Sequence, residues 1–193
     1  MANVKLERDL SIVFTLESGA VVYSKPVARA VFEKNYMQLA KVYSAIQEQS
    51  LITTGSSIAA RMLRELQTQG LADADLFLAN IHQRTQIATY AQPAKEGAVG
   101  SYEQHMMADA IRKNLIDEDD VAEIENLLVF ITAVSYLAGS KATAALILNW
   151  SLGMRKAQRT SSTFTAFLTS LLTSMTEENS GVNAAAPVAE QAE

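Results

Sequence analysis

The chain has 193 residues, of which 49% are hydrophobic and none is cysteine, and its formal net charge is −5. This length suits one domain with its own core, and without cysteine there are no disulfides, thiolate metal sites or cysteine nucleophile. The acidic balance argues against a nucleic-acid partner, because nucleic-acid-binding surfaces are rich in clustered Lys and Arg.

The N-terminal segment has the clearest strand pattern of the chain. Apolar and polar residues alternate over residues 10–16, apolar residues return at 21–23, and Gly19 suits the turn between them. Two strands alone are marginally stable in water. We therefore expect residues 1–24 to form a short β-hairpin that packs on helices or pairs with another chain.

Helical periodicity accounts for residues 25–175, and the low counts of 8 glycines and 3 prolines also favour helices. The predicted fold class is mainly α: a helical bundle with a short N-terminal β-hairpin and a disordered C-terminal tail. A loop is expected at residues 92–100, which contain Pro93. The helices expected before this loop run from Ser24 and Pro26 to about residue 49, from 58 to 69 with a stop at Gly70, and from Asp73 to about residue 90.

Four more helices are expected after the loop, two of them paired in a hairpin. Ser101 and Gln104 match a capping box, and residues 117–158 are expected to form an antiparallel helical hairpin broken at Gly139. The apolar run at 127–138 is shorter than the ~20 residues of a bilayer span, so we predict a buried helix and no membrane contact. The last helix is expected at 162–175, before an acidic, Ala-rich tail at 176–193 that we expect to be disordered.

Six carboxylates are concentrated between residues 117 and 125. Their spacing does not fit a calcium-binding loop, because Val121 and Ala122 occupy positions where such a loop needs an oxygen ligand and a glycine. Acidic residues are instead favourable at a helix N-terminus, and a hairpin turning at Gly139 would bring basic residues opposite them. The predicted pairs are Asp120 with Arg159, and Glu123 and Glu125 with Arg155 and Lys156.

The sequence contains no recognised catalytic or cofactor motif. The two histidines, His82 and His105, lie outside any HExxH-type motif, and GxGxxG, P-loop and GxSxG patterns are absent. We therefore expect no enzyme, no catalytic residue, no cofactor and no metal. The segment at 57–70, with Arg61 and Arg64, looks like a DNA-recognition helix without a wing, so a helical DNA-binding regulator is a less favoured alternative.

Features at both ends of the chain resemble tail assembly chaperones of tailed bacteriophages. The likeness lies in the N-terminal segment SIVFTLESGAVVYSKP leading into a helix, the helical middle, the Thr/Ser-rich segment TSSTFTAFLTSLLTSMTEEN and the Ala/Pro/Glu tail. The resemblance implies a non-catalytic protein that binds the long hydrophobic tape-measure protein, keeps it soluble and helps to recruit tail-tube protein. It also implies a place in the host cell cytoplasm and absence from the mature virion.

Two further questions stay open beside this resemblance. A structural virion protein of the tail or connector is the main alternative, and the chain could form a homo-oligomer.

A holder of a hydrophobic helical client needs an apolar helical surface with a polar rim, and the last predicted helix offers one. The same stripe could instead close the protein's own core. The predicted client-binding residues are Phe164, Phe167, Leu168, Leu171, Leu172 and Met175.

Overall fold

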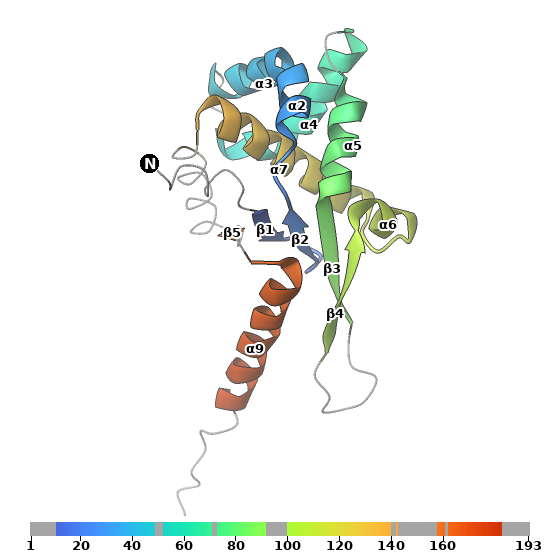
Figure 1. The fold of residues 1–193 in the computed structure, drawn as a ribbon, viewed down its shortest axis with the longest axis vertical. Helices are drawn as coiled ribbons and strands as arrows, with labels where there is room; N and C mark the ends of the chain where they lie inside the picture. The colour runs from blue at the N-terminus through green and yellow to red at the C-terminus, as the bar shows by residue number, and fades with distance from the viewer. Residues whose placement is uncertain are drawn as a thin grey trace, which may run out of the picture. The chain divides into compact units, whose positions relative to one another are not determined.

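Helices and a small antiparallel sheet make up the described part of the chain (Figure 1). The chain divides into two compact units, residues 1–89 with 103–161 (unit 1) and residues 90–102 with 162–193 (unit 2). The computed structural model describes residues 11–48, 52–70, 73–91, 100–139, 142, 158–160 and 162–182.

The sheet has five strands in the order β4-β3-β2-β1-β5. β1 pairs antiparallel with β2 and with β5, and β2 pairs antiparallel with β3. The register aligns Phe14, Val22 and Ile87 across the three central strands, and all three side chains are buried. The strands are β1 Ser11–Thr15, β2 Val21–Ser24, β3 Thr85–Ala91, β4 Ser101–Met106 and β5 Gln158–Thr160.

The β1–β2 connection turns at Gly19, whose φ of +86° is a conformation that favours glycine. The amide of Leu16 donates to the carbonyl of Ala20 at 2.9 Å, which closes the turn. The β1–β2 pair is not isolated, because it belongs to a larger sheet. β1 lies between β2 and β5, so its backbone is paired on both sides.

One helix, α7 (Glu118–Leu137), is buried on every side over residues 124–134. Asp117 accepts a hydrogen bond from the amide of Asp120 at 2.8 Å, as expected for an N-cap, and Gly139 with φ of +87° follows the last turn. α7 contacts α3, α4 and α5 (Figure 1). The other helices are α2 Arg29–Lys34, α3 Tyr36–Glu48, α4 Ile52–Thr68, α5 Ala74–Arg84, α6 Met107–Arg112 and α9 Phe164–Val182.

The hydrophobic core belongs to unit 1. It combines the buried face of the strands with the inward sides of the helices, and its largest fully buried members include Phe14, Phe77, Phe130, Leu63 and Ile124. Burying one side chain of this kind stabilises a fold by ~1.5–3 kcal/mol. The predicted burial of the apolar run at 127–138 is confirmed over residues 127–134.

The helix predicted from Ser24 to about residue 49 is wrong at its start and in its middle. Ser24 ends β2 opposite Ile12, and the first helical residue is Arg29. Asn35 then separates α2 from α3, with φ of −107° and ψ of 12°, and its side-chain amide donates to the carbonyl of Val31 at 3.0 Å. This hydrogen bond satisfies a carbonyl at the end of α2 and allows the chain to change direction.

The helix predicted from Asp73 is correct at its start but continues too far. Asp73 caps α5 by accepting from the amide of Leu76 at 3.0 Å, and α5 ends at Arg84. Residues 85–91 form β3 because they pair with β2, where Thr85 lies opposite Ser24. The predicted capping box at Ser101 is also wrong, since residues 101–106 form β4 and α6 starts at Met107.

Two further helices are longer than predicted, one at its N-terminus and one at its C-terminus. α4 starts at Ile52, six residues before the predicted start, while Gly70 has the expected positive φ of 70°. α9 extends to Val182, so residues 176–182 are helical rather than disordered. Residues 92–99 of the predicted loop, 143–157 of the predicted helical hairpin and 183–193 of the predicted tail lie outside the described residues.

Unit 2 contains a close tyrosine pair at the β3–β4 end. The rings of Tyr90 and Tyr102 meet edge to face, with centroids 5.5 Å apart. A side chain at Gly100 would overlap the ring of Tyr90, so glycine at this position allows the pair to form. Burial, together with the nearby Tyr90 hydroxyl, raises the pKa of Tyr102 above its ordinary value of 10.0.

No helix of the described residues combines the length and apolarity needed to cross a membrane.

Candidate functional site

The predicted client-binding stripe lies on α9, in unit 2. Phe164 and Leu168 are buried, each with 3% of its surface exposed, whereas Phe167, Leu171 and Leu172 are half-buried. The spacing of three and four residues places these five side chains on one side of the helix. The side chain of Met175 lies outside the described residues.

Hydroxyl groups on α9 are satisfied within the helix itself. The hydroxyl of Thr163 accepts a hydrogen bond from the amide of Ala166 at 3.3 Å, at the helix start. Thr169 and Thr173 donate to the carbonyls four residues earlier, at 2.9 and 3.0 Å. Thr and Ser can line a polar helix face in this way without tertiary partners. Over residues 163–173 the polar side of α9 therefore consists of short uncharged residues.

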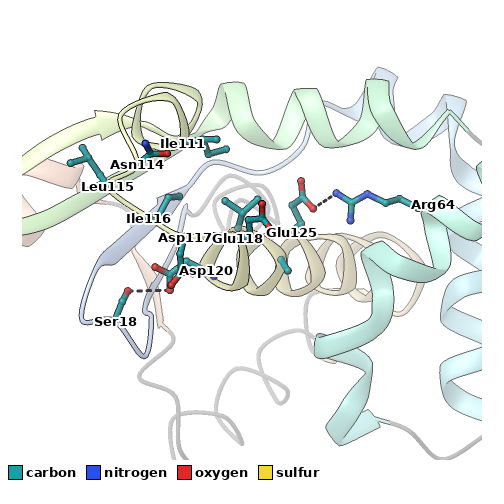
Figure 2. A pocket seen from close by; sticks show the side chains of 12 residues that line it. Ser18, Arg64, Ile111, Asn114, Leu115, Ile116, Asp117, Glu118, Asp120 and Glu125 are labelled. Atoms are coloured by element: carbon teal, nitrogen blue, oxygen red, sulfur yellow. Dashed lines mark hydrogen bonds and ion pairs between the residues drawn. The ribbon is translucent and has the colours of Figure 1, made fainter.

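Unit 1 contains a polar cluster that joins three helices. Glu125 on α7, with 3% of its side chain exposed, accepts from Arg64 on α4 through Oε2 and lies 2.8 Å from Nε2 of His82 on α5 through Oε1. Figure 2 shows the guanidinium of Arg64 reaching from α4 toward this carboxylate. Next to it, Asn126 accepts from the backbone amide of Ala60 at 2.8 Å.

The partners of Glu125 keep its carboxylate charged. Burial alone would raise the pKa of Glu125, but the hydrogen bonds with His82 and Arg64 and the charge of Arg64 outweigh burial. The pKa of Glu125 therefore lies below its ordinary value of 4.5. A buried carboxylate without partners would be strongly destabilising, so the cluster ties α4 and α5 to α7.

An open groove of about 720 Å³ runs along the N-terminal half of α7 in unit 1 (Figure 2). One end is apolar, at Leu115 and Ile111, and the other is formed by Glu125 and Arg64. Between them, the first turn of α7 contributes acidic side chains. The hydroxyl of Ser18, from the β1–β2 turn, donates to the carboxylate of Asp120 at 3.1 Å and so joins this turn to the first turn of α7.

The predicted charge pairing of the acidic cluster is wrong for Glu125, which pairs with Arg64 and His82. Arg159 lies in strand β5 opposite Ile12, so it is not on a helix antiparallel to α7. Arg155 and Lys156 lie outside the described residues. The predicted capping role is confirmed, because Asp117 caps α7 and three carboxylates occupy its first turn.

Sequence reasoning missed the partners of Glu125 because Arg64 and His82 are 61 and 43 residues away from it. The only sequence signal is a carboxylate at the start of an apolar run, which has to find a cation if it is buried. His105, the second histidine, lies elsewhere, with Nε2 3.8 Å from the Glu103 carboxylate. Among the described residues, no three His, Asp or Glu side chains form a group that could hold a metal ion.

The predicted DNA-recognition segment forms most of α4. Of its two arginines, Arg64 donates to Glu125, while Arg61 is exposed. The same helix packs against α7, and its Ala60 amide donates to the side-chain oxygen of Asn126 on α7. One of the two candidate base-reading cations is thus already engaged in an ion pair within the fold.

Comparisons of the chain with protein-family models, with curated proteins and with solved structures find no match.

Proposed function

We propose that this chain is a non-catalytic tail assembly chaperone of a tailed bacteriophage, which binds the tape-measure protein, keeps it soluble and helps to recruit tail-tube protein. It would act in the host cell cytoplasm and be absent from the mature virion. The observation that carries the proposal is α9, a 19-residue amphipathic helix whose apolar side retains partly exposed residues. The sequence resemblance also supports the proposal through the N-terminal strands and the Thr/Ser-rich last helix, although β3 and β4 interrupt the helical middle.

The chemistry of α9 supports a role in holding an apolar helix. Phe164 and Leu168 are buried, while Phe167, Leu171 and Leu172 keep surface that a client helix can cover. Recognition of this kind places apolar side chains of one helix between those of another. The Thr and Ser hydroxyls between residues 163 and 173 make the rim beside these apolar side chains polar.

The C-terminal residues contribute charge to the same end of the chain. Residues 176–193 contain four glutamates and no Lys or Arg, which gives them a formal charge of −4. Negative charge keeps a protein soluble while it carries an apolar partner, because like charges oppose aggregation. A long hydrophobic client would gain solubility from each bound copy.

The test uses co-expression with the tape-measure protein encoded in the same phage genome, where we expect its gene to lie directly downstream. Phe167→Asp should lower client binding about 10- to 100-fold, since a buried Phe is worth ~1.5–3 kcal/mol. Thermal unfolding should stay nearly unchanged because Phe167 is only half-buried. Pull-down of tape-measure protein and calorimetry measure the two effects.

The matched control is Ala166→Asp, which adds the same charge at a neighbouring exposed position of α9. This variant should bind the client like the unmodified chain. Collapse of the fold in Phe167→Asp would assign the stripe to the core. Copurification of the chain with mature tails, and never with free tape-measure protein, would instead favour a structural virion subunit.

A further inference from the structure

We propose that the groove along the N-terminal half of α7 is a second protein-binding site, which receives a partner's amphipathic helix carrying Lys or Arg beside a Leu-sized apolar side chain. This site lies in unit 1, whereas the stripe of the proposed function lies on α9 in unit 2. The inference does not rest on the proposed function.

Charge is the first reason for a basic occupant. Four carboxylates and one guanidinium line the groove, so the lining carries a formal charge of −3. Arg64 compensates Glu125, but no ion pair of the described residues involves Asp117, Glu118 or Asp120. The α7 N-terminus offsets only roughly half a charge. The described lining in the middle of the groove is therefore acidic and suits a cation.

The apolar end of the groove is the second reason. Asn114 follows α6 with φ of +53°, and the amide of Leu115 donates back to the carbonyl of Ala110 at 2.9 Å. This helix-ending motif leaves Leu115 38% exposed beside the half-buried Ile111. An apolar side chain of a partner can cover Leu115 while a basic one reaches the carboxylates.

The dimensions suit a segment of protein. A volume of about 720 Å³ is within the ~300–1,000 Å³ of ordinary ligand pockets. Ala122, an exposed residue with a small side chain, lies in its wall on α7 between the acidic turn and Glu125. A helix can therefore lie along α7 with side chains three and four residues apart facing the groove.

The experiment measures binding of a fluorescein-labelled Leu/Lys amphipathic peptide to the full chain by fluorescence anisotropy, with a Leu/Glu peptide of the same pattern as a second probe. We expect the Leu/Lys peptide alone to bind, and more weakly as salt rises, because exposed charges are screened. Glu118→Lys should weaken binding about tenfold, which corresponds to ~1.4 kcal/mol. Ala122→Trp should abolish binding by filling the groove.

Two control variants separate the groove from general charge and exposure. Asp119→Lys makes the same charge change in the same helical turn, but Asp119 does not line the groove. Leu115→Ser is compared with Leu76→Ser, which alters a similarly exposed leucine on α5. The two controls, Asp119→Lys and Leu76→Ser, should bind the peptide within about twofold of the unmodified chain, a difference of only ~0.4 kcal/mol.

Several results would overturn the groove proposal. These are no binding of the Leu/Lys peptide, equal weakening by Glu118→Lys and Asp119→Lys, or unchanged binding by Ala122→Trp. Each variant is checked by thermal unfolding, and Glu118→Lys decides the matter if Ala122→Trp does not fold. Failure here leaves tape-measure binding through α9 untouched, because that function is measured with another ligand and with Phe167→Asp.

Discussion

Glu125 shows how one carboxylate can define the arrangement of three helices. It is 97% shielded from solvent, yet each of its oxygens has a partner on a different neighbouring helix. A buried carboxylate costs several kcal/mol unless its partners are in place. Arrangements of α4 and α5 in which Arg64 or His82 does not reach Glu125 are therefore disfavoured. Asn126 adds to this selection by binding the α4 backbone directly.

Replacing Glu125 with Gln should lower the free energy of unfolding at pH 7 by about 1–3 kcal/mol, because hydrogen bonds to a charged group are lost. The folded-state pKa of Glu125 is lowered from 4.5, so the carboxylate stabilises the fold fully above about that pH. Its contribution is lost as the pH falls through the lowered pKa. Urea unfolding at pH 7 and pH 3 should therefore show a difference between the two proteins that shrinks at acid pH.

An exposed ion pair provides the comparison for this residue. Glu33 accepts from Arg29 at 2.7 Å on the surface of α2, where both side chains are more than half exposed. Glu33→Gln should leave stability nearly unchanged at both pH values, because solvent screens such pairs. A pH-independent loss in Glu125→Gln would contradict the assigned role of the charge.

At the scale of elements, four of the predicted helix-end signals are present, although the predicted caps at Ser24 and Ser101 are not. Asp73 and Asp117 cap the helices that the sequence assigned to them, and Gly70 and Gly139 have the positive φ expected after a helix. These signals are local, since a cap needs only the residue and the backbone three positions away. They could therefore be identified without knowledge of the tertiary structure.

The strands β3 and β4 were missed because their pairing depends on residues far along the chain. Thr85 to Tyr90 follow α5 without Gly or Pro, so the helical pattern continued through them by periodicity alone. The available signal was the alternation of Thr85, Ile87 and Thr89, all β-branched residues. Ser101 and Gln104 matched a capping box, although the segment pairs into the sheet.

The candidate groove was beyond sequence reasoning for the same physical reason. Its walls come from the β1–β2 turn, α4, the end of α6 and α7, which only the tertiary fold brings together. The sequence did identify the acidic start of α7 as notable. It assigned Glu125 to the wrong partners because it treated residues 117–158 as a symmetrical helical hairpin.

The turn after α6 permits a direct test of how an element ends. Asn114 adopts φ of +53°, a conformation that costs most residues other than glycine ~1–2 kcal/mol. Asn114→Ala should lower the free energy of unfolding by about 1 kcal/mol, while Asn114→Gly should be nearly neutral. Urea unfolding of both variants measures the two values.

Lys113→Ala is the control, since Lys113 is the preceding exposed residue and has φ of −88°. It should leave stability close to that of the unmodified chain. Equal losses for Ala at positions 113 and 114 would show that side-chain contacts, rather than the backbone conformation, matter at this turn.

At the scale of the whole molecule, the hydrophobic core and α9 belong to different units. Every member of the main apolar cluster lies in unit 1, and neither Phe164 nor Leu168 is part of it. Among the described residues, the main apolar cluster therefore contains no residue of α9. A protein organised in this way can devote its last helix to a partner without weakening its own fold.

This division predicts that a chain ending at Ser161 still unfolds cooperatively, with a thermal midpoint within about 2 °C of the full chain, and no longer binds tape-measure protein. If Phe164 and Leu168 instead close the core, their loss removes about 3–6 kcal/mol of burial. For a chain of this size, each kcal/mol lowers the midpoint by ~2–4 °C, so the decrease would be at least ~6 °C. Calorimetry of the two chains distinguishes these outcomes, and pull-down with tape-measure protein shows whether α9 is the part that binds the client.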